Sequence, residues 1–359
     1  EGEPLGHAEE VIAGKAATCT EAGLTDGVKC AACDQVLTVQ EEIPALGHSF
    51  TDGICSTCGA ADPDYEAPEL IKWYGVNTTL GGALSLNFAL DTNQLNGTTG
   101  NYIVLTRSYA DDREDHVIRI DQADWTMDGS FAIVSYTDIA AKEMSDVITA
   151  VVYNAEGEVI SEAKSDSIAT YALRMLGKES VNTVPVQRTL YVDMLNYGAA
   201  AQNYFGYATD DLANADLTAE QAAWATESVT ISNSREMSAN CFGTNLQLEN
   251  EIILQVAFAE TYTEGMYVVA TFTDHYGVKK EQTLDVTEDN GYVIVSVTGM
   301  AIADYEAMVT CRLYNAEGTE LGYAIDSMES YVARNATKLG ELGDAIMKLG
   351  ASGYAYFHS

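Results

Sequence analysis

Hydrophobic residues in the middle of the chain occur in short stretches with the length of β-strands. β-Branched and aromatic residues are frequent in these stretches, and Gly, Asn or Asp residues, which favour turns, separate them. The stretches span residues 83–90, 101–106, 116–120, 131–136 and 147–153. Their number and spacing predict an immunoglobulin-like (Ig-like) β-sandwich domain.

The hydrophobic period changes after residue 166. Residues 167–177 and 189–205 carry apolar side chains at positions i, i+3 and i+4, which predicts two helices. Thr218 and Gln221 have the spacing of a capping box, so we expect another short helix to begin there. The β-domain is therefore followed by a helical tail.

The same succession of segments then repeats. Phe131–Ser135 matches Tyr292–Ser296, and the string Tyr-Asn-Ala-Glu-Gly at 153–157 recurs at 314–318 with the same offset. Later matches keep their order: Asp166, Ser167, Tyr171 and Arg174 recur as Asp326, Ser327, Tyr331 and Arg334, and residues 197–199 and 204–205 correspond to 349–351 and 356–357.

These matches predict two homologous copies of one unit, at residues 70–207 and 228–359, with a connector at 208–227. We expect the copies to superpose with Tyr153 over Tyr314 and with Arg174 over Arg334.

The N-terminal region has a different composition. Residues 1–60 contain five of the seven cysteines and two of the five histidines, with few long apolar runs. Residues 61–69 are acidic and contain Pro63 and Pro68, which predicts a linker. The fold class that we predict is therefore multidomain and mainly β with helical segments. A small Cys/His module precedes two β-sandwich domains, each followed by helices.

Cysteine and histidine recur in step within this module. Leu5-Gly6-His7 recurs as Leu46-Gly47-His48, and Cys30-x-x-Cys33 recurs as Cys55-x-x-Cys58. Two thiolates separated by two residues can bind one tetrahedral ion from a tight turn, and a distant His or Cys completes the site. Zinc is therefore the predicted cofactor. The candidate ligands are His7, Cys19, Cys30, Cys33, His48, Cys55 and Cys58.

A disulfide framework and reactive redox thiols are the alternatives to zinc. Five cysteines cannot all pair within the module, and a disulfide scheme gives the histidines no role. Redox thiols lack the βαβ context in which they usually occur. A structural metal would supply folding energy to a module too small to bury enough apolar surface.

The grouping of the seven candidates has three interpretations. Grouping by repeat unit gives a four-ligand site and a three-ligand site: His7, Cys19, Cys30, Cys33 and His48, Cys55, Cys58. A zinc ribbon would instead combine the two Cys-x-x-Cys pairs. A third interpretation completes the first site with His48 instead of His7. Cys30 and Cys33 are ligands in all three interpretations.

The charge of the chain excludes some partners. The sequence has 18 Lys and Arg against 54 Asp and Glu, a net charge of −36. Such a charge repels phosphate backbones and anionic lipid, so we expect no nucleic-acid partner. No run of about 18 apolar residues occurs, so we expect no membrane insertion. The charge fits an exported protein, and a halophilic cytosolic protein would have a similar one.

Motifs of catalysis are missing from the sequence. It has no His-Glu-x-x-His, no Gly-x-Ser-x-Gly and no phosphate-binding glycine loop. His116, His275 and His358 occur singly, and we expect them at the surface or in turns. Cys241 and Cys311 form either a pair of buried free thiols or a facultative disulfide. We predict that the chain is not an enzyme.

The N-terminal strings together carry a resemblance. They are Thr-Cys-Thr-Glu-Ala-Gly-Leu at 18–24, Pro-Ala-Leu-Gly-His at 44–48 and Gly-Ile-Cys-Ser-Thr-Cys-Gly at 53–59. This region resembles a Cys/His repeat of large, modular surface proteins secreted by anaerobic Gram-positive bacteria. The helical segment Tyr191–Tyr207 is similar to segments of the same kind of protein. The resemblance implies a secreted or cell-surface location in bacteria and carries no known reaction.

We therefore predict a binding, adhesion or spacer role at a bacterial surface, with a surface glycan or a protein as the ligand. The 21 tyrosines and three tryptophans could stack on sugar rings, although strands also use such residues for packing. An accessory, glycan-binding region of a larger secreted hydrolase is the alternative. A purely structural stalk is the third hypothesis.

Overall fold

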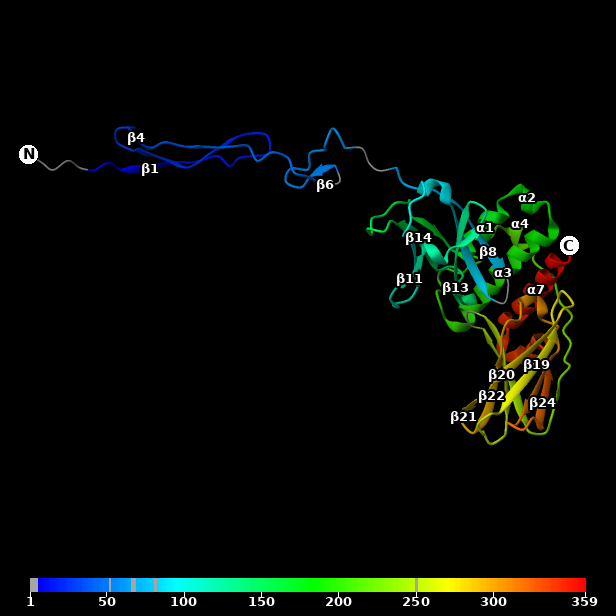
Figure 1. Cartoon of the computed structure of the whole chain (residues 1–359). Coiled ribbons are helices and arrows are strands. Elements are labelled where there is room, and N and C mark those ends of the chain that lie inside the picture. The colour runs from blue at the N-terminus through cyan, green and yellow to red at the C-terminus, as the bar shows by residue number, and fades with distance from the viewer. Residues whose placement is uncertain (1–5, 52, 66–68, 81–82, 249–250) are drawn as a thin grey trace, which may run out of the picture. The chain divides into compact units, whose positions relative to one another are not determined.

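The structure is a computed structural model that describes residues 6–51, 53–65, 69–80, 83–248 and 251–359 (Figure 1). The chain divides into two compact units, Glu1–Glu69 and Leu70–Ser359. Parts of the predicted module and linker, residues 1–5, 52 and 66–68, lie outside the described residues. The fold is mainly β, with several antiparallel sheets.

The first unit consists of short strands and loops. Its strands are β1 (Glu9–Ile12), β2 (Gly23–Leu24), β3 (Gly27–Cys30), β4 (Val36–Thr38), β5 (Glu42–Ile43), β6 (Phe50–Thr51) and β7 (Ile54–Cys55). They pair in the orders β1-β3-β4, β2-β5 and β6-β7, all antiparallel.

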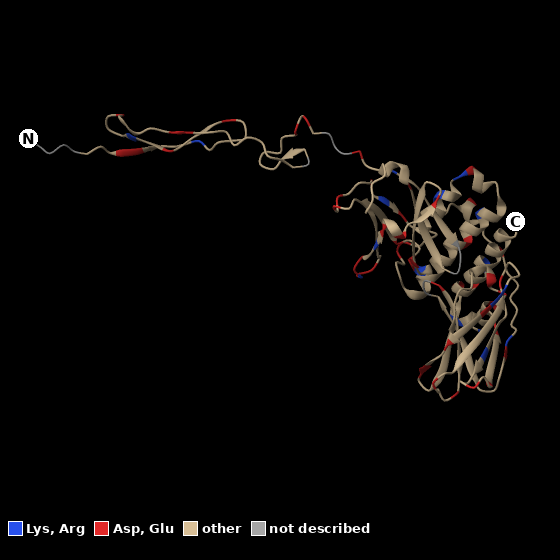
Figure 2. Cartoon of the chain, viewed as in Figure 1, with Lys and Arg blue, Asp and Glu red and all other residues tan. Residues whose placement is uncertain are grey.

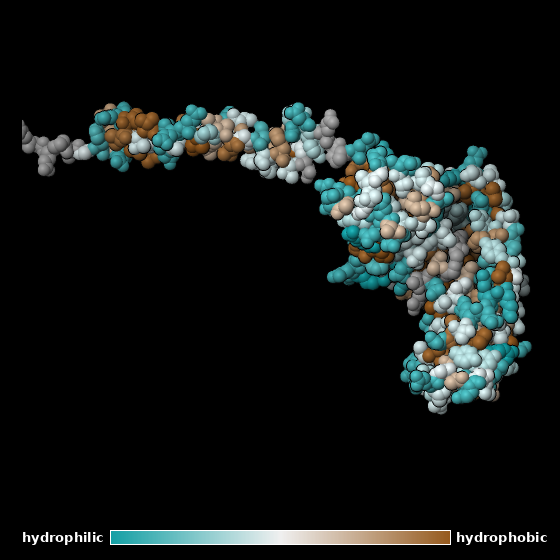
Figure 3. Space-filling view, in the orientation of Figure 1, coloured by the Kyte–Doolittle hydropathy of each residue, from teal (hydrophilic) through white to brown (hydrophobic). Residues whose placement is uncertain are grey.

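This unit has no hydrocarbon core among its described residues. The buried residues are three cysteines and three glycines: Cys19, Cys30, Cys55, Gly23, Gly27 and Gly53. Large apolar side chains instead lie at its surface, where hydrophobic residues are visible in Figure 3. Val11 is 66% exposed, Val39 72% and Leu46 64%. Cys19, Cys30 and Cys55 therefore lie in the interior of this unit, whereas Cys33 and Cys58 are exposed.

The first copy begins the second unit. Its strands are β8 (Trp73–Leu80), β9 (Leu84–Asp91), β10 (Tyr102–Ser108), β11 (His116–Asp121), β12 (Thr126–Asp128), β13 (Phe131–Ile139), β14 (Val147–Tyr153) and β15 (Lys164–Asp166). Its helices are the 3-10 helices η1 (Thr92–Leu95), η2 (Gln122–Asp124) and η3 (Ala141–Glu143) and the α-helices α1 (Ile168–Leu176), α2 (Glu179–Asn182) and α3 (Pro185–Phe205). The five predicted strands and the two predicted helices are all present.

The segment after α3 contains α4 (Ala219–Ala222), and the second copy follows it. Its strands are β16 (Glu236–Met237), β17 (Cys241–Leu248), β18 (Ile252–Phe258), β19 (Tyr267–Thr273), β20 (Lys279–Asp285), β21 (Thr287–Asp289), β22 (Tyr292–Val297), β23 (Val309–Tyr314) and β24 (Glu320–Asp326). Its helices are η4 (Ile302–Asp304), α5 (Met328–Arg334), α6 (Ala336–Leu339) and α7 (Glu341–Phe357). The predicted capping box at Thr218 and Gln221 is confirmed, because both of its hydrogen bonds are present before α4.

The two copies share one strand order. The first has sheets β11-β10-β14-β15 and β12-β13-β9-β8, and the second has β20-β19-β23-β24 and β21-β22-β18-β17, with β16 added beside β24. Tyr153 pairs with and stacks on Tyr102 in the first copy, as Tyr314 does on Tyr267 in the second. The two tyrosines that the repeat aligns thus occupy equivalent positions.

The helix after each last strand begins in the same way. Ser167 caps α1 by accepting a hydrogen bond from the Thr170 backbone, and Ser327 caps α5 in the same manner. Arg174 pairs with the buried Asp166 at 2.6 Å, and Arg334 pairs with Asp326. In each copy, the serine of the repeated Asp-Ser dipeptide therefore caps a helix, and the aspartate pairs with an arginine of that helix.

The two helical tails connect the copies. α3 and α7 pack against each other, and the buried residues of both copies belong to one hydrophobic cluster. In the described part of the chain, no helix is both long enough and apolar enough to cross a membrane. Acidic residues are spread over both units, whereas Lys and Arg are few (Figure 2).

Candidate metal centre

The two Cys-x-x-Cys segments fold into the same tight turn. Cys30 ends β3 and Cys55 ends β7. Each of these cysteines donates its backbone N–H to the carbonyl five residues later at 2.8 Å and accepts from the N–H four residues later at 2.9 Å. The residue after the second cysteine has a positive φ, 57° at Asp34 and 74° at Gly59. The repeated sequence thus builds the same turn twice.

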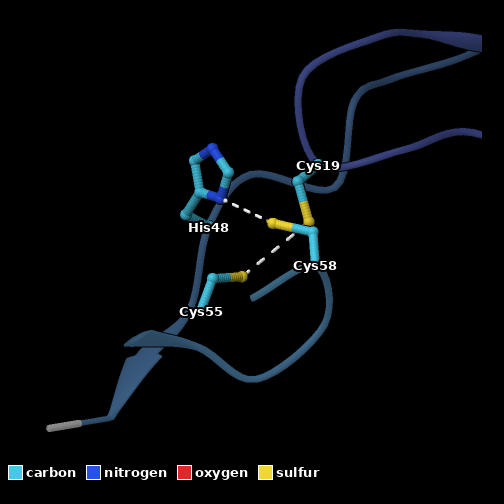
Figure 4. Close-up of side chains that lie close together, drawn as sticks. All are labelled: Cys19, His48, Cys55 and Cys58. Atoms are coloured by element: carbon cyan, nitrogen blue, oxygen red, sulfur yellow. Dashed lines mark hydrogen bonds between the residues drawn. The ribbon is translucent and has the colours of Figure 1, made fainter. Parts of the chain in front are cut away.

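Cys19, His48, Cys55 and Cys58 form a four-residue cluster, in which the ligand atoms all lie within 4.8 Å of one another. Figure 4 shows their sulfurs and the imidazole pointing toward a common centre. The Sγ atoms of Cys19 and Cys55 are 3.9 Å apart, and His48 Nδ1 is 3.4 Å from Cys58 Sγ. Around one tetrahedral Zn²⁺, with bonds of about 2.3 Å to sulfur and about 2.0 Å to nitrogen, these separations would be about 3.8 and about 3.5 Å. The cluster therefore has the dimensions of a zinc site.

A hairpin brings Cys19 to this cluster. The hairpin is closed by two backbone hydrogen bonds between Lys15 and Leu24, of 2.7 and 2.9 Å. At its tip, the N–H groups of residues 46 and 47 donate to the carbonyls of residues 18 and 19, at 2.9 and 3.1 Å. The segment that carries Cys19 is therefore bound directly beside His48.

His7, Cys30 and Cys33 form a second group, whose ligand atoms also lie within 4.8 Å of one another. His7 Nδ1 is 3.7 Å from Cys33 Sγ, close to the His48–Cys58 separation. Cys30 is buried, whereas His7 and Cys33 are exposed. This group has a histidine and a turn equivalent to those of the four-residue cluster, but it has one thiol fewer.

The structure corrects the predicted grouping by one residue. Cys19 belongs with His48, Cys55 and Cys58, so grouping by repeat unit is wrong for Cys19. The zinc ribbon is wrong because the two Cys-x-x-Cys pairs lie in different groups. The interpretation that completes the first site with His48 instead of His7 is also wrong, since His7 lies beside Cys33. All seven candidates nevertheless lie in one of two groups close enough to hold a metal ion.

Electrostatics within the clusters favours a cation. Hydrogen bonds from the Ala32 backbone and from His7 lower the pKa of Cys30 to about 6. His48 and backbone N–H groups of the turn lower that of Cys55 to about 5. Burial and the neighbouring thiols raise the pKa of Cys19 to about 11. Three sulfurs this close can ionise together only when a positive ion offsets their repulsion.

All seven cysteines are free thiols. A disulfide requires sulfurs about 2.05 Å apart, far closer than the 3.9 Å between Cys19 and Cys55. Cys241 and Cys311 are also free and buried, and burial raises the pKa of Cys311 to about 12. Such thiols stay protonated and unreactive at neutral pH.

A second candidate site is a cavity of about 520 Å³ between the two copies. Aromatic, basic and amide side chains line it, among them Tyr109, Tyr204, Phe205, Tyr331, Arg113, Lys142, Lys338, Asn245 and Gln247. Four of its lining residues are basic and two are acidic, a local excess of positive charge in a strongly acidic chain.

A buried ion network forms one wall of this cavity. Arg107 pairs with Glu143 and with Asp146, the latter at 2.9 Å, and its guanidinium also donates to the Asp138 carbonyl. Tyr207 donates its hydroxyl to Asp146 at 2.8 Å. Burial alone would raise the pKa of Glu143, and Arg107 holds it below its usual value. Sequence analysis missed this network because its members lie far apart along the chain.

His275 lies in a turn, which is one of the two positions expected for it. Its side chain is nevertheless only 7% exposed, and its Nδ1 is 2.6 Å from Asp304 Oδ1. The other ring nitrogen is buried without a hydrogen-bond partner among the described residues. The sequence pattern does not predict this contact, because Asp304 is far from His275 along the chain and lies in a short 3-10 helix.

Comparisons with known proteins give little further information. No protein-family model matches the chain, and no curated protein matches it. A pullulanase complexed with maltotriose, from Anoxybacillus sp. LM18-11, is a structural match with 10% identity and a TM-score of 0.15. The match covers 69% of this chain and 25% of the pullulanase chain. A likeness at this TM-score carries no argument about fold or function.

Proposed function

We propose that this chain is a non-catalytic part of a secreted or surface-exposed bacterial protein, in which a structural zinc module accompanies two Ig-like β-sandwich domains. One observation carries the proposal. The Cys19–His48–Cys55–Cys58 cluster takes the place of a core in a unit whose described residues bury no hydrocarbon side chain. Four protein ligands fill a tetrahedral sphere, so the ion supports folding and leaves no position for a reacting water.

Zinc is the metal that this donor set favours. Thiolates and imidazole select zinc over calcium, magnesium or manganese, which prefer oxygen ligands. The Cys19–Cys55 and His48–Cys58 separations match tetrahedral geometry, which zinc prefers in structural sites. The same set would bind Co²⁺, which makes the site accessible to absorption spectroscopy.

The Ig-like assignment rests on the sheets. Each copy has two antiparallel sheets with one shared strand order, and the buried side chains of both sheets contribute to one hydrophobic core. Two such sheets packed face to face make a β-sandwich. Modular construction of this kind suits binding, adhesion or spacing, and the resemblance of the Cys/His repeat supports a bacterial surface.

Metal analysis of the purified chain tests this proposal. We expect at least one Zn²⁺ per chain, bound in the Cys19 cluster. Cys19→Ser should lose that ion because one of the four ligands is removed. Cys241→Ser is the matched control, since it removes a buried thiol outside both clusters and should retain the metal. A chain purified without metal and unable to bind Zn²⁺ or Co²⁺ contradicts the proposal.

The cavity favours the alternative, an accessory glycan-binding region of a larger secreted hydrolase. Aromatic rings beside amide and basic groups suit stacking on sugar rings and hydrogen bonding to their hydroxyls. Screening the chain against a glycan library tests this function. Tyr109→Ala and Phe205→Ala should each abolish a genuine signal, whereas Tyr74→Ala, an exposed aromatic outside the cavity, should not. Binding that survives both cavity substitutions would place the glycan elsewhere.

A further inference from the structure

The four-residue cluster takes its ligands from two units of the Cys/His repeat. The second unit supplies its histidine, His48, and its pair Cys55 and Cys58. Cys19 comes from the first unit, where it lies in sequence between His7 and the first Cys-x-x-Cys pair. One unit of the repeat thus provides a thiol to the metal site of the next.

The second unit of the Cys/His repeat is also shorter than the first and has no cysteine equivalent to Cys19. Its own site is complete because the hairpin at residues 15–24 is bound beside His48 through two backbone hydrogen bonds. The hairpin is therefore the connecting element, and its thiol is the connecting ligand.

The three-residue group is the same site without its connecting ligand. His7 lies beside Cys33 as His48 lies beside Cys58, and the two turns have the same backbone hydrogen bonds and the same positive φ. In the described part of the chain, no fourth His, Cys, Asp or Glu joins this group. His7 and Cys33 are exposed, so a further ligand can reach them.

We infer that His7, Cys30 and Cys33 form a zinc half-site, which is completed by a cysteine thiolate presented on the hairpin of another unit of the same repeat. The metal at this position then joins two units, as the ion in the complete cluster joins the two units described above. The inference rests on the proposed binding of zinc at the complete cluster. A water molecule in the fourth position is the competing arrangement.

Cobalt titration of the full chain tests the inference. One equivalent of Zn²⁺, which has no visible absorption, first fills the complete cluster. Co²⁺ is then added alone or with a synthetic peptide of residues 14–24, the hairpin that bears Cys19. The control peptide carries Cys19→Ser, and the control chain carries Cys33→Ser, which removes a ligand of the half-site only.

We expect the peptide to tighten Co²⁺ binding by about tenfold or more, because a thiolate replaces water as the fourth ligand. The visible bands should strengthen toward those of a tetrahedral site with three thiolates. The Ser peptide should have no effect, and the Cys33→Ser chain should not respond to either peptide. If the affinity for Co²⁺ is the same with the Cys19 peptide as with the Ser peptide or without any peptide, the inference is overturned. Failure to bind the first equivalent of Zn²⁺ instead contradicts the proposed function on which the inference rests.

The oligomeric state identifies the source of the thiolate. A second copy of the chain has its only hairpin thiol, Cys19, in its own complete cluster, so we expect the zinc-loaded chain to remain a monomer in sedimentation. If the chain remains a monomer and responds to the peptide, the source is a further unit of the repeat rather than a second copy. A monomer that does not respond to the peptide overturns the inference.

Discussion

Arg107 is a buried basic residue of the second unit, with its side chain 2% exposed. Replacing it with methionine would leave Asp146 buried without its cation and Glu143 paired with Arg113 alone. We predict that Arg107→Met lowers the free energy of unfolding by about 3–5 kcal/mol, since breaking a buried ion pair strands the partner charge. Urea unfolding followed by tryptophan fluorescence measures this loss.

Arg119→Met is the matched control for this substitution. Arg119 pairs with Asp121 at the surface, where both side chains are more than half exposed. Its loss should change the free energy of unfolding by less than about 1 kcal/mol. The deficit of Arg107→Met should also shrink at acid pH, because the stranded Asp146 carboxyl group then becomes neutral. Similar losses for both variants would contradict the assigned role of Arg107.

Individual residues also show the limit of sequence reasoning in this chain. Spacing and residue type are local, and they sufficed to select all seven members of the two Cys/His groups. The group to which Cys19 belongs depends on backbone hydrogen bonds between residues 18–19 and 46–47, which are far apart in sequence. Arg107 was missed for the same reason. The equivalent position in the second copy is occupied by Phe272, so the repeat gave no hint of it.

At the scale of elements, the contact between α7 and η4 depends on a small residue. A Cβ atom added at Gly350 would lie 2.7 to 2.9 Å from Cγ, Cδ1 and Cβ of Tyr305. These atoms lie near the base of a buried ring and cannot move aside easily. We predict that Gly350→Ala lowers the free energy of unfolding by about 1–3 kcal/mol, as overpacking does in cores.

Gly353, in the same helix, provides the comparison. A Cβ atom there would lie 3.6 Å from Ile302 and 3.8 Å from Ala303, which is ordinary van der Waals contact. Gly353→Ala should therefore be neutral or stabilise by up to about 1 kcal/mol through helix propensity. Thermal unfolding of the two variants distinguishes them. A more stable Gly350→Ala protein would contradict the packing described for α7.

Elements with strong local signals were the predictable ones. The five predicted strands and both long helices have clear hydrophobic periods, and they lie where expected within a few residues. Strands β8, β12 and β15 were not expected. β12 and β15 have only three residues each, and β8 contains polar residues at Asn77, Thr78 and Thr79, so its pairing with β9 is decided by the sheet.

At the scale of the whole molecule, each of the two compact units is stabilised by a different kind of interior. The unit Leu70–Ser359 has a large hydrophobic core. The first unit, in its described residues, buries cysteines and glycines instead. We therefore expect metal removal to unfold the first unit and to leave the second intact, because only the first depends on metal ligation for its folding free energy.

Hydrogen–deuterium exchange of the full chain, read by mass spectrometry before and after chelation of zinc, tests this central claim most directly. The account predicts that amides of residues 15–60 are protected in the zinc-loaded chain and exchange rapidly once the metal is removed. Amides of residues 70–359 should exchange at the same rate in both states. Equal protection of residues 15–60 with and without zinc would contradict the account, as would a loss of protection in both units together.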